Sequence, residues 1–428
     1  MAKYLIQKLS LKTNSIMLKK TSITSILVLN LLALNGLAQQ FVWTQKANFT
    51  PANRYGSFHF SIGNFGYVGS GLVQSGTSIT LINDFWEYDA LADAWSQKAT
   101  LPASGRLGAS SFEVNNKGYV TTGFDLGSTY FNDTWEYNPI TNIWTQKANF
   151  AGGVRYTCAS FVIGNTAYVG MGKYGSYFSD FFSFNPLTNT WSTIASIPGP
   201  LRQSARGFAI NGFGFVVGGA NQGTNYNSYD LWQYDPQSNT WLQKTSYPGS
   251  ASYGNAVFIL NNLAFLGTGS KLVTTGQSTF DDFYYYDPVI DTWTATQNFG
   301  GGTRQGSSFM TIGNKAYVGL GSSDVYPNIN YKNDWWSFAD VTAVSNAVSS
   351  INNYTVSYSS DNIIFSVRYT DVEINFSVCD LSGKVIYSKN LLPQNSSIQF
   401  KKSFFAKGVY VARFNTNKSS NRLKFLVN

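Results

Sequence analysis

Arginine side chains recur at a fixed spacing along this chain and are its first candidates for chemistry. In five places an arginine stands eleven residues after a tryptophan. Guanidinium groups bind carboxylates through paired hydrogen bonds, so a set of them could form a pocket for an anion or a sugar acid. Arg206 stands outside this register, which makes it a better candidate for a specific contact. The recurring arginines are Arg54, Arg106, Arg155, Arg202 and Arg304.

Aspartates recur with the same period and suggest either paired acids or calcium ligands. Because six equivalent copies are present, we instead expect a turn or capping role, with pairs such as Asn83-Asp84 bonding their own backbone. Asp281 beside Asp282 is the only local doublet, which is weak evidence for a metal, and we expect none. The recurring aspartates are Asp84, Asp133, Asp180, Asp230, Asp282 and Asp334.

Few side chains stand out as an acid or base. The sequence has one histidine, His59, which we expect to be packed or at a rim. Glu87 and Glu136 occupy equivalent repeat positions, whereas Glu113 stands alone in its repeat. General acid–base catalysis needs a group at the reacting atoms, and none is clearly placed there, so the catalytic residues are unknown.

The segments between repeats vary in length and are rich in aromatic residues and amides. Loops that vary in a repeat protein gather on one face, often the binding face. Aromatic rings and amides suit sugar recognition, although the same composition also makes stiff surface loops. The candidate binding residues on this face are Tyr130, Tyr174, Tyr177, Arg206, Tyr226, Tyr229, Tyr326 and Tyr331.

These residues belong to a repeat of about fifty residues, the length of a four-stranded propeller blade. Short aromatic and β-branched segments joined by turns such as Gly313-Asn314 predict strands. A last block begins at Asp334 but lacks its tryptophan, and Trp43 supplies an orphan copy near the N-terminus. We therefore predict an all-β chain with a six-bladed propeller that an N-terminal strand closes. The repeat tryptophans are Trp43, Trp95, Trp144, Trp191, Trp241 and Trp293.

The repeat resembles kelch propellers, the family that includes the galactose oxidase central domain. The resemblance rests on glycine pairs such as Gly218-Gly219, turns such as Tyr234-Asp235-Pro236, and the repeat tryptophans and arginines. It implies that the arginines brace neighbouring strands. It also raises copper, but that site needs two histidines and the chain has one, so we expect no cofactor. Kelch propellers serve many functions, so the fold alone does not choose among them.

The two ends of the chain indicate export. Residues 1–38 read as a signal peptide, with Met17 as a candidate for the true start. Residues 39–342 form the propeller and 343–350 a linker. Segments such as Asp380-Leu381-Ser382-Gly383-Lys384 and Lys407-Gly408-Val409-Tyr410 make residues 351–428 resemble the type A C-terminal sorting domain of type IX secretion in Bacteroidota. This resemblance implies a small immunoglobulin-like β-sandwich that the outer-membrane translocon recognises, and a protein that is released or attached at the surface.

Charge and composition narrow the functions. The chain carries a net charge of +8, but the positive charge lies in the two end segments, and residues 39–350 are slightly acidic. We therefore expect no nucleic acid partner, and no transmembrane segment in the mature chain. We favour a secreted module that binds a glycan or a surface protein. The alternatives are a carbohydrate-active enzyme like the six-bladed kelch sialic-acid mutarotases, and a purely structural surface protein.

Overall fold

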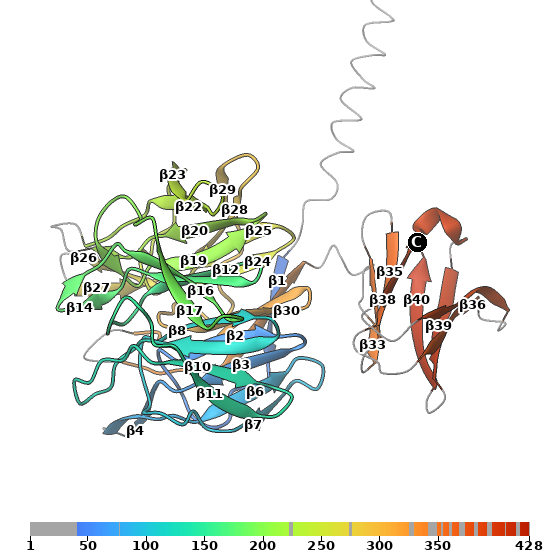
Figure 1. Cartoon of the computed structure of the whole chain (residues 1–428), viewed down its shortest axis with the longest axis horizontal. Helices are drawn as coiled ribbons and strands as arrows, with labels where there is room; N and C mark the ends of the chain where they lie inside the picture. Colours follow the sequence, from blue (N-terminus) through green and yellow to red (C-terminus); the bar gives the residue numbers. More distant parts are fainter. Residues whose placement is uncertain are drawn as a thin grey trace, which may run out of the picture. The chain divides into compact units, whose positions relative to one another are not determined.

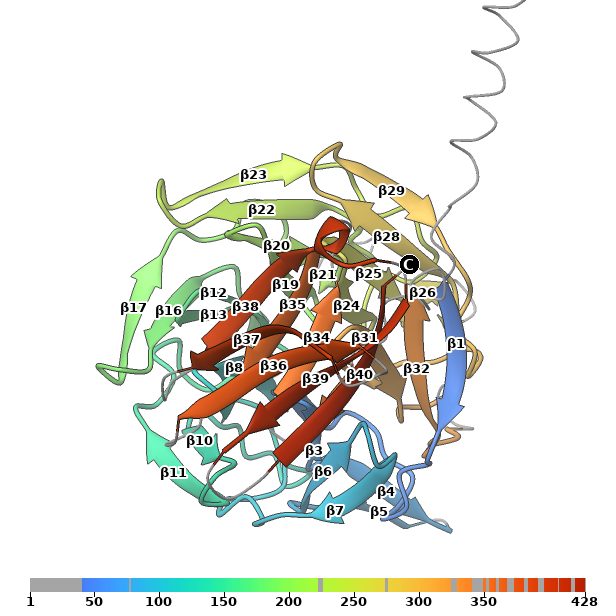
Figure 2. The same ribbon diagram turned by 90° about the vertical axis from the view of Figure 1, so that its right-hand side faces the viewer.

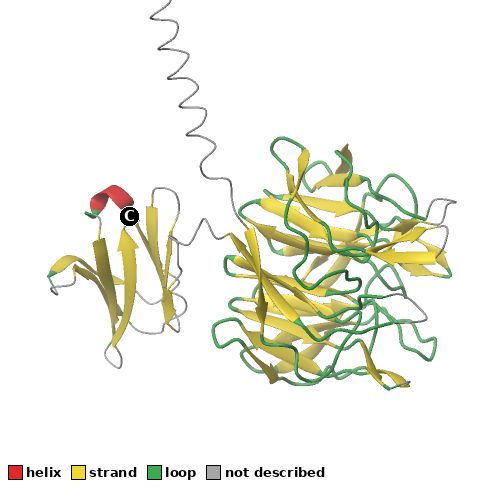
Figure 3. Ribbon diagram, turned by 180° about the vertical axis from the view of Figure 1, so that it is seen from behind, coloured by secondary structure: helices red, strands yellow, loops and turns green. Residues whose placement is uncertain are grey.

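The computed structural model describes residues 41–427, apart from 77, 222–225, 274–275, 325–328, 341–348, 352–353, 359–361, 368–372, 381–383, 392–395, 407 and 417–419. The chain divides into two compact units at residue 340. The expected signal peptide and most of the expected linker lie outside the described residues. Among the described residues the regular secondary structure is almost entirely strand, and Figure 3 shows these strands joined by loops.

The first unit, Phe41–Ala339, contains six four-stranded antiparallel sheets (Figure 1). Five of the sheets use four strands that follow one another along the chain, interrupted only by short strands that belong to two-stranded sheets. Their strands are β2 (Phe58–Ile62), β3 (Phe65–Gly69), β6 (Phe85–Asp89), β7 (Ala94–Gln97); β8 (Ser110–Val114), β9 (Lys117–Thr121), β10 (Thr134–Asn138), β11 (Ile143–Lys147); β12 (Ala159–Ile163), β13 (Thr166–Gly170), β16 (Phe181–Asn185), β17 (Thr190–Ile194); β19 (Arg206–Ile210), β20 (Phe213–Val217), β22 (Leu231–Asp235), β23 (Thr240–Lys244); and β24 (Ala256–Leu260), β25 (Leu263–Gly267), β28 (Phe283–Asp287), β29 (Thr292–Ala295).

The sixth sheet joins the two ends of the propeller. Strands β30 (Ser308–Ile312), β31 (Lys315–Gly319) and β32 (Trp335–Asp340) are completed by β1 (Phe41–Lys46), which lies against β32 (Figure 2). Phe41 stacks on Phe338 of β32, with ring centroids 5.1 Å apart. The predicted six-bladed, N-terminally closed propeller is therefore confirmed.

The first strand of each blade lies innermost. These six strands contact one another in a ring around the central channel. Buried and partly exposed residues alternate along β2, β8 and β30, because one side of each strand packs between blades while the other faces the channel. The second strands instead end in runs of buried residues, since neighbouring blades cover both of their faces.

The repeat tryptophans join each blade to the one before it. The indole Nε1 of Trp95, for example, donates to the carbonyl of Ala47, and that of Trp144 donates to Ala99 at 2.8 Å. Trp191, Trp241 and Trp293 repeat this bond. Among the described residues Trp43 is the exception, because its Nε1 has no hydrogen-bond partner. It lies instead among the rings of Phe258, Phe283, Phe299 and Phe338.

The recurring arginines and aspartates form buried ion pairs. Both terminal nitrogens of Arg54 donate to the carboxylate of Asp84, at 2.6 and 3.0 Å, and Arg304 binds Asp334 in the same way at 2.6 and 2.9 Å. The guanidinium groups are almost wholly buried, and four of the five stand against phenylalanine rings, such as Phe49 against Arg54. The remaining pairs are Arg106–Asp133, Arg155–Asp180 and Arg202–Asp230.

This geometry differs from the expected role of the aspartates, and it also differs from the anion pocket that was the alternative to a bracing role for the arginines. The aspartate carboxylates accept bonds from arginines and, in four blades, from a tryptophan Nε1, so the expected side-chain-to-backbone turn is not their main contact. Asn83 does bond the backbone, but as a donor to Leu101 and Ala103. The five arginines are already paired and buried, so they do not line an anion pocket.

The fifth blade lacks its arginine and thereby offers a stability test. Ser252 stands in the arginine position, and Oδ1 of Asp282 is buried without a hydrogen-bond partner among the described residues. The double variant Ser252→Arg, Tyr247→Phe copies the sixth blade, where Phe299 stands beside Arg304. We expect it to raise the free energy of unfolding by about 1–3 kcal/mol, because a charged group regains its hydrogen bonds. Thermal unfolding of Tyr247→Phe alone is the control, and equal melting temperatures would contradict the prediction.

Small hairpins extend the connections between the second and third strands. They lie on the variable segments, and their strands are β4 (Leu72–Ser75), β5 (Ser78–Leu81), β14 (Lys173–Tyr174), β15 (Ser176–Tyr177), β26 (Ser270–Val273) and β27 (Gly276–Thr279). A further two-stranded sheet pairs β18 (Arg202–Gln203) with β21 (Ala220–Asn221).

The second unit consists of two four-stranded antiparallel sheets whose buried residues share one core. One sheet contains β33 (Ser349–Ile351), β34 (Tyr354–Tyr358), β35 (Asn362–Val367) and β38 (Ser396–Lys401). The other contains β37 (Val385–Leu391), β36 (Ile374–Asp380), β39 (Gly408–Asn415) and β40 (Ser420–Val427), and a single 3₁₀ turn spans Lys402–Phe404. The first two residues of β33, Ser349 and Ser350, fall within the expected linker of residues 343–350.

Candidate functional site

The central channel of the propeller holds two adjoining chambers of about 250 and 260 Å³. The inner chamber is lined by residues along the innermost strands, such as Ser111, Ser160 and Phe309. The outer chamber is lined mainly by residues that precede those strands, such as Tyr55 and Tyr156. His59, Ala109, Cys158 and Arg206 line both chambers. The space suits a small ligand, and the shared residues mark where the chambers meet.

The inner chamber has one polar wall and one apolar wall. Each innermost strand supplies the residue five positions after the repeat arginine or its serine substitute. The first three blades supply polar side chains and the last three supply a glycine and two apolar side chains. In chain order these residues are His59, Ser111, Ser160, Gly207, Val257 and Phe309. A sugar ring has hydroxyl groups and apolar C–H faces, so such a chamber is suited to one.

Hydrogen bonds between neighbouring blades orient the polar wall. The Ser111 hydroxyl donates to the His59 carbonyl at 2.6 Å, and the Ser160 hydroxyl donates to the Ser111 carbonyl at 3.1 Å. Across the chamber the Thr311 hydroxyl donates to the Ile259 carbonyl at 3.2 Å. Because a hydroxyl oxygen has two lone pairs, these oxygens can still accept hydrogen bonds from a ligand.

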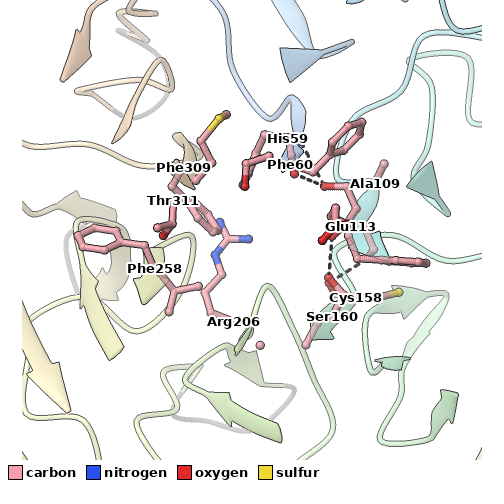
Figure 4. A pocket seen from close by; sticks show the side chains of 18 of the residues that line it. His59, Phe60, Ala109, Glu113, Cys158, Ser160, Arg206, Phe258, Phe309 and Thr311 are labelled. Carbon is pink, nitrogen blue, oxygen red and sulfur yellow. Dashed lines mark hydrogen bonds between the residues drawn. The ribbon is translucent and has the colours of Figure 1, made fainter. Parts of the chain in front are cut away.

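Arg206 extends into the channel from the first residue of β19 (Figure 4). Its Nε donates to the Asn255 carbonyl, and its guanidinium carbon lies 5.1 Å from the ring centroid of Phe309, which is two blades away. Burial lowers the pKa of Arg206 to about 10, an effect that Tyr55 partly opposes, so the group is charged at neutral pH. No carboxylate among the described residues lies within ion-pair distance of Arg206. The structure therefore places Arg206 inside the channel, and not with the variable loops as expected.

His59 lies on the polar wall as a neutral imidazole. Its Nδ1 is 3.2 Å from the Ser57 carbonyl, so Nδ1 is the donor and Nε2 is left as an acceptor. Burial, with the nearby charge of Arg206, lowers the pKa of His59 to about 3, although the bond to Ser57 favours the charged form. His59 thus offers the channel an acceptor and no charge.

Glu113 is the one carboxylate among the residues that line the two chambers. It lies on β8 in the inner chamber, and one of its oxygens accepts the Asn116 backbone N–H at 2.6 Å. Burial raises the pKa of Glu113, an effect that this hydrogen bond partly offsets. The sequence identified Glu113 as unrepeated but did not place it in the channel.

The channel residues predict how anion binding depends on pH. Arg206 stays charged up to about pH 10 and His59 stays neutral down to about pH 3. Affinity for a carboxylate should therefore show no step from His59 and should fall as pH rises through 10. Glu113 should add a separate decrease as pH rises through its raised pKa, because the ionised carboxylate repels an anion. Calorimetric titrations across this range test the expectation. A step near pH 6.5 that disappears in His59→Asn would contradict it, because it would show that His59 titrates with its ordinary pKa.

The aromatic candidates on the variable segments do not form one site. Tyr331 is 6% exposed and stacks on Tyr55, and Tyr229 is partly buried against a core cluster and donates to the Ser250 carbonyl. Tyr226 is 48% exposed, and Tyr177 stands beside Lys173. Tyr130 and Tyr174, and Tyr331 through Tyr55, join rings that reach the outer chamber. Tyr326 lies outside the described residues.

The copper site that the galactose oxidase resemblance raised does not fit this channel. The whole chain has a single histidine, so a second imidazole ligand is missing. Within the part of the chain that the structure describes, no three His, Cys, Asp or Glu side chains are grouped to hold a metal. Cys158 and Cys379 are buried free thiols in different units.

The fold and the family comparisons define the class. Residues 151–321 match the KLHDC2/KLHL20/DRC7 Kelch-repeats domain, and residues 359–428 match the secretion system C-terminal sorting domain. The chain is a kelch-type β-propeller followed by a type IX secretion sorting domain. The sorting domain indicates that the protein is secreted or attached to the cell surface. Among the described residues no helix has the length and hydropathy to cross a membrane.

Two individual proteins are also similar to this chain, one in sequence and one in structure. A stretch of 89 residues is 37% identical to the N-acetylneuraminate epimerase of Vibrio cholerae, which is 20% of this chain and 23% of that protein. The chain thus spans about a quarter of the length of that relative. The solved structure of YjhT has a TM-score of 0.56 and 17% identity over 68% of this chain and 96% of its own, which shows a shared fold.

Proposed function

We propose that the propeller is a secreted or surface-attached binding module that takes a carboxylate-bearing sugar into its central channel. The observation that carries this proposal is Arg206, the one propeller arginine without an acidic partner among the described residues. A buried charge is costly unless it is paired, so a charged group kept unpaired beside a cavity is a candidate ligand contact. The ligand carboxylate would supply the partner that aspartates supply to the other five arginines.

The two walls of the inner chamber support a sugar over other organic acids. Phe309 and Val257 offer contact to an apolar sugar face, while Ser111, Ser160 and His59 offer acceptors to hydroxyl groups. The local similarity to an N-acetylneuraminate epimerase supports N-acetylneuraminic acid as the first ligand to test.

Calorimetry with the full chain tests the proposal. We expect N-acetylneuraminic acid to bind, and its methyl ester, which has the same ring but no negative charge, to bind at least tenfold more weakly. Equal affinity for acid and ester would contradict the role of Arg206. Absence of binding to either ligand would contradict the proposal as a whole.

A second candidate function is epimerisation of the bound sugar acid. It is favoured by Glu113, whose raised pKa suits proton transfer, in the same chamber as Arg206. Opening a sugar ring moves a proton from the anomeric hydroxyl to the ring oxygen, and Glu113 would carry that proton. Nuclear magnetic resonance exchange between the two anomers measures this rate. An exchange rate no faster than in buffer, or a rate unchanged in Glu113→Gln, would contradict the epimerase function and leave binding as the only proposed function.

For the sorting domain we propose that residues 351–428 are the part that the outer-membrane translocon recognises. Their match to the sorting family supports this assignment. If residues 351–428 are deleted in the native cell, we expect the propeller to remain in the periplasm and not to cross the outer membrane. Immunoblots of cell fractions measure where it is. Normal export of the truncated chain would contradict the proposal.

A further inference from the structure

A cluster of four aromatic rings runs outward from the outer chamber. Phe124 and Tyr156 line the chamber and lie 4.6 Å apart between ring centroids. Tyr130 contacts both of these rings, at 5.9 and 5.7 Å, and Tyr174 lies 4.9 Å beyond Tyr130. We call Phe124, Tyr130, Tyr156 and Tyr174 the aromatic ridge.

The ridge is rigid and its exposure increases outward. Backbone bridges join Leu107 to Phe124, Phe124 to Tyr130, and Tyr156 to Lys173. Phe124, Tyr130 and Tyr156 are partly buried, whereas Tyr174, on the β14–β15 hairpin, is 47% exposed. The rings thus form a continuous surface from the channel interior to solvent, and rigid aromatic rings offer contact area at little entropic cost.

The position of Arg206 leaves the outer chamber for a second group. A sugar acid in the inner chamber, between the polar and apolar walls, can bring its carboxylate to Arg206 where the chambers meet. The outer chamber is then filled only if the ligand continues beyond the acidic ring. The ridge consists of one phenylalanine and three tyrosine rings and contains no basic side chain, so it favours a neutral ring over a second acid.

From this arrangement we infer that the ligand is the acidic end of a glycan, with a neutral sugar linked to the acidic one and packed on the aromatic ridge. The inference rests on the proposed function, and it replaces the free sugar acid by a sugar acid at the end of a glycan. The neutral ring would place its apolar face on Tyr156 and Phe124, and the rest of the glycan would leave past Tyr174.

Calorimetry with the full chain and two ligands tests the inference. The ligands are N-acetylneuraminic acid and the same sugar joined to galactose. We expect the disaccharide to bind roughly tenfold more tightly, and the double variant Tyr156→Ala, Tyr174→Ala to lose this gain while its affinity for the monosaccharide changes less than twofold. Tyr226→Ala, an exposed tyrosine away from the ridge, is the matched control and should retain the gain.

The outcomes separate this inference from the proposed function. If the monosaccharide binds and the disaccharide binds no more tightly, the ridge inference is wrong and the proposed function stands. A loss of both affinities in the ridge variant, with an unchanged melting temperature, would also overturn the inference, because the ridge would then serve the acidic sugar. If the ridge double variant unfolds, single changes at Tyr174, the most exposed ring, replace it. Tyr174→Ala must then lose the extra affinity for the disaccharide, and Tyr174→Phe must keep it. If neither ligand binds, both proposals fail.

Discussion

Replacement of Arg206 by methionine is expected to weaken the binding of N-acetylneuraminic acid by at least about 100-fold. Truncating one partner of a buried, hydrogen-bonded charge pair typically costs about 2–5 kcal/mol. Methionine retains an unbranched apolar stem against Phe309 but removes the guanidinium. Calorimetry measures the affinity of the variant, and Arg206→Lys, which keeps the charge but not the planar fork, should fall between the two.

Stability distinguishes this role from a structural one. Arg206 has no acidic partner among the described residues, so removing its charge leaves no carboxylate unpaired. The melting temperature of Arg206→Met should therefore equal or exceed that of the native chain. A variant that both unfolds at lower temperature and keeps its affinity for the sugar acid would show that Arg206 supports the fold.

Asp334→Asn is expected to destabilise the propeller by about 3–5 kcal/mol, the usual cost of removing one partner of a buried ion pair. Arg304 is 1% exposed and would keep its charge without a carboxylate. Although burial opposes ionisation of Asp334, the hydrogen bonds and charge of Arg304 hold the pKa of Asp334 below its usual range. The contribution of this pair is accordingly present at neutral pH and is lost as pH falls through that lowered pKa.

The fifth blade provides the matched control for this prediction. Asp282 occupies the same repeat position but has no arginine partner, because Ser252 stands at the arginine position of this blade. Asp282→Asn therefore removes no ion pair and should change the free energy of unfolding by less than about 1 kcal/mol. Denaturant unfolding of the two variants measures the difference. Equal destabilisation of both would mean that the aspartate, and not its pairing with arginine, stabilises the blade.

The spacing of tryptophan, arginine and aspartate was sufficient to predict six blades and the closing strand, because these residues make the same contacts in every repeat. The channel wall could not be found by that search. Its six residues share a register but differ in type, from His59 to Phe309, since a ligand site breaks the repeat symmetry. A comparison of the residue types five positions after each repeat arginine, or after Ser252, would have identified this position as one that varies between blades and lines the channel.

Arg206 and Tyr331 show why the position of a residue in the repeat does not predict the direction of its side chain. Arg206 occupies the register of Phe58, which is buried between blades, yet its guanidinium extends into the channel to Phe309, two blades away. Tyr331 lies on a variable segment but packs against Tyr55. Both outcomes depend on which neighbours leave space, and neighbours from different blades are about fifty residues or more away in the sequence.

The pairing of β1 with β32 determines when this protein can complete its fold. The Ser337 side chain bonds the Thr44 carbonyl, across 293 residues of sequence. A ribosome must therefore synthesise almost the whole propeller before its first strand finds a partner, and until then β1 and β32 remain open edges that can pair with other chains. Closure is therefore a late event that requires β32 to have been synthesised, and the interval before it is when the chain is most exposed to aggregation and proteolysis.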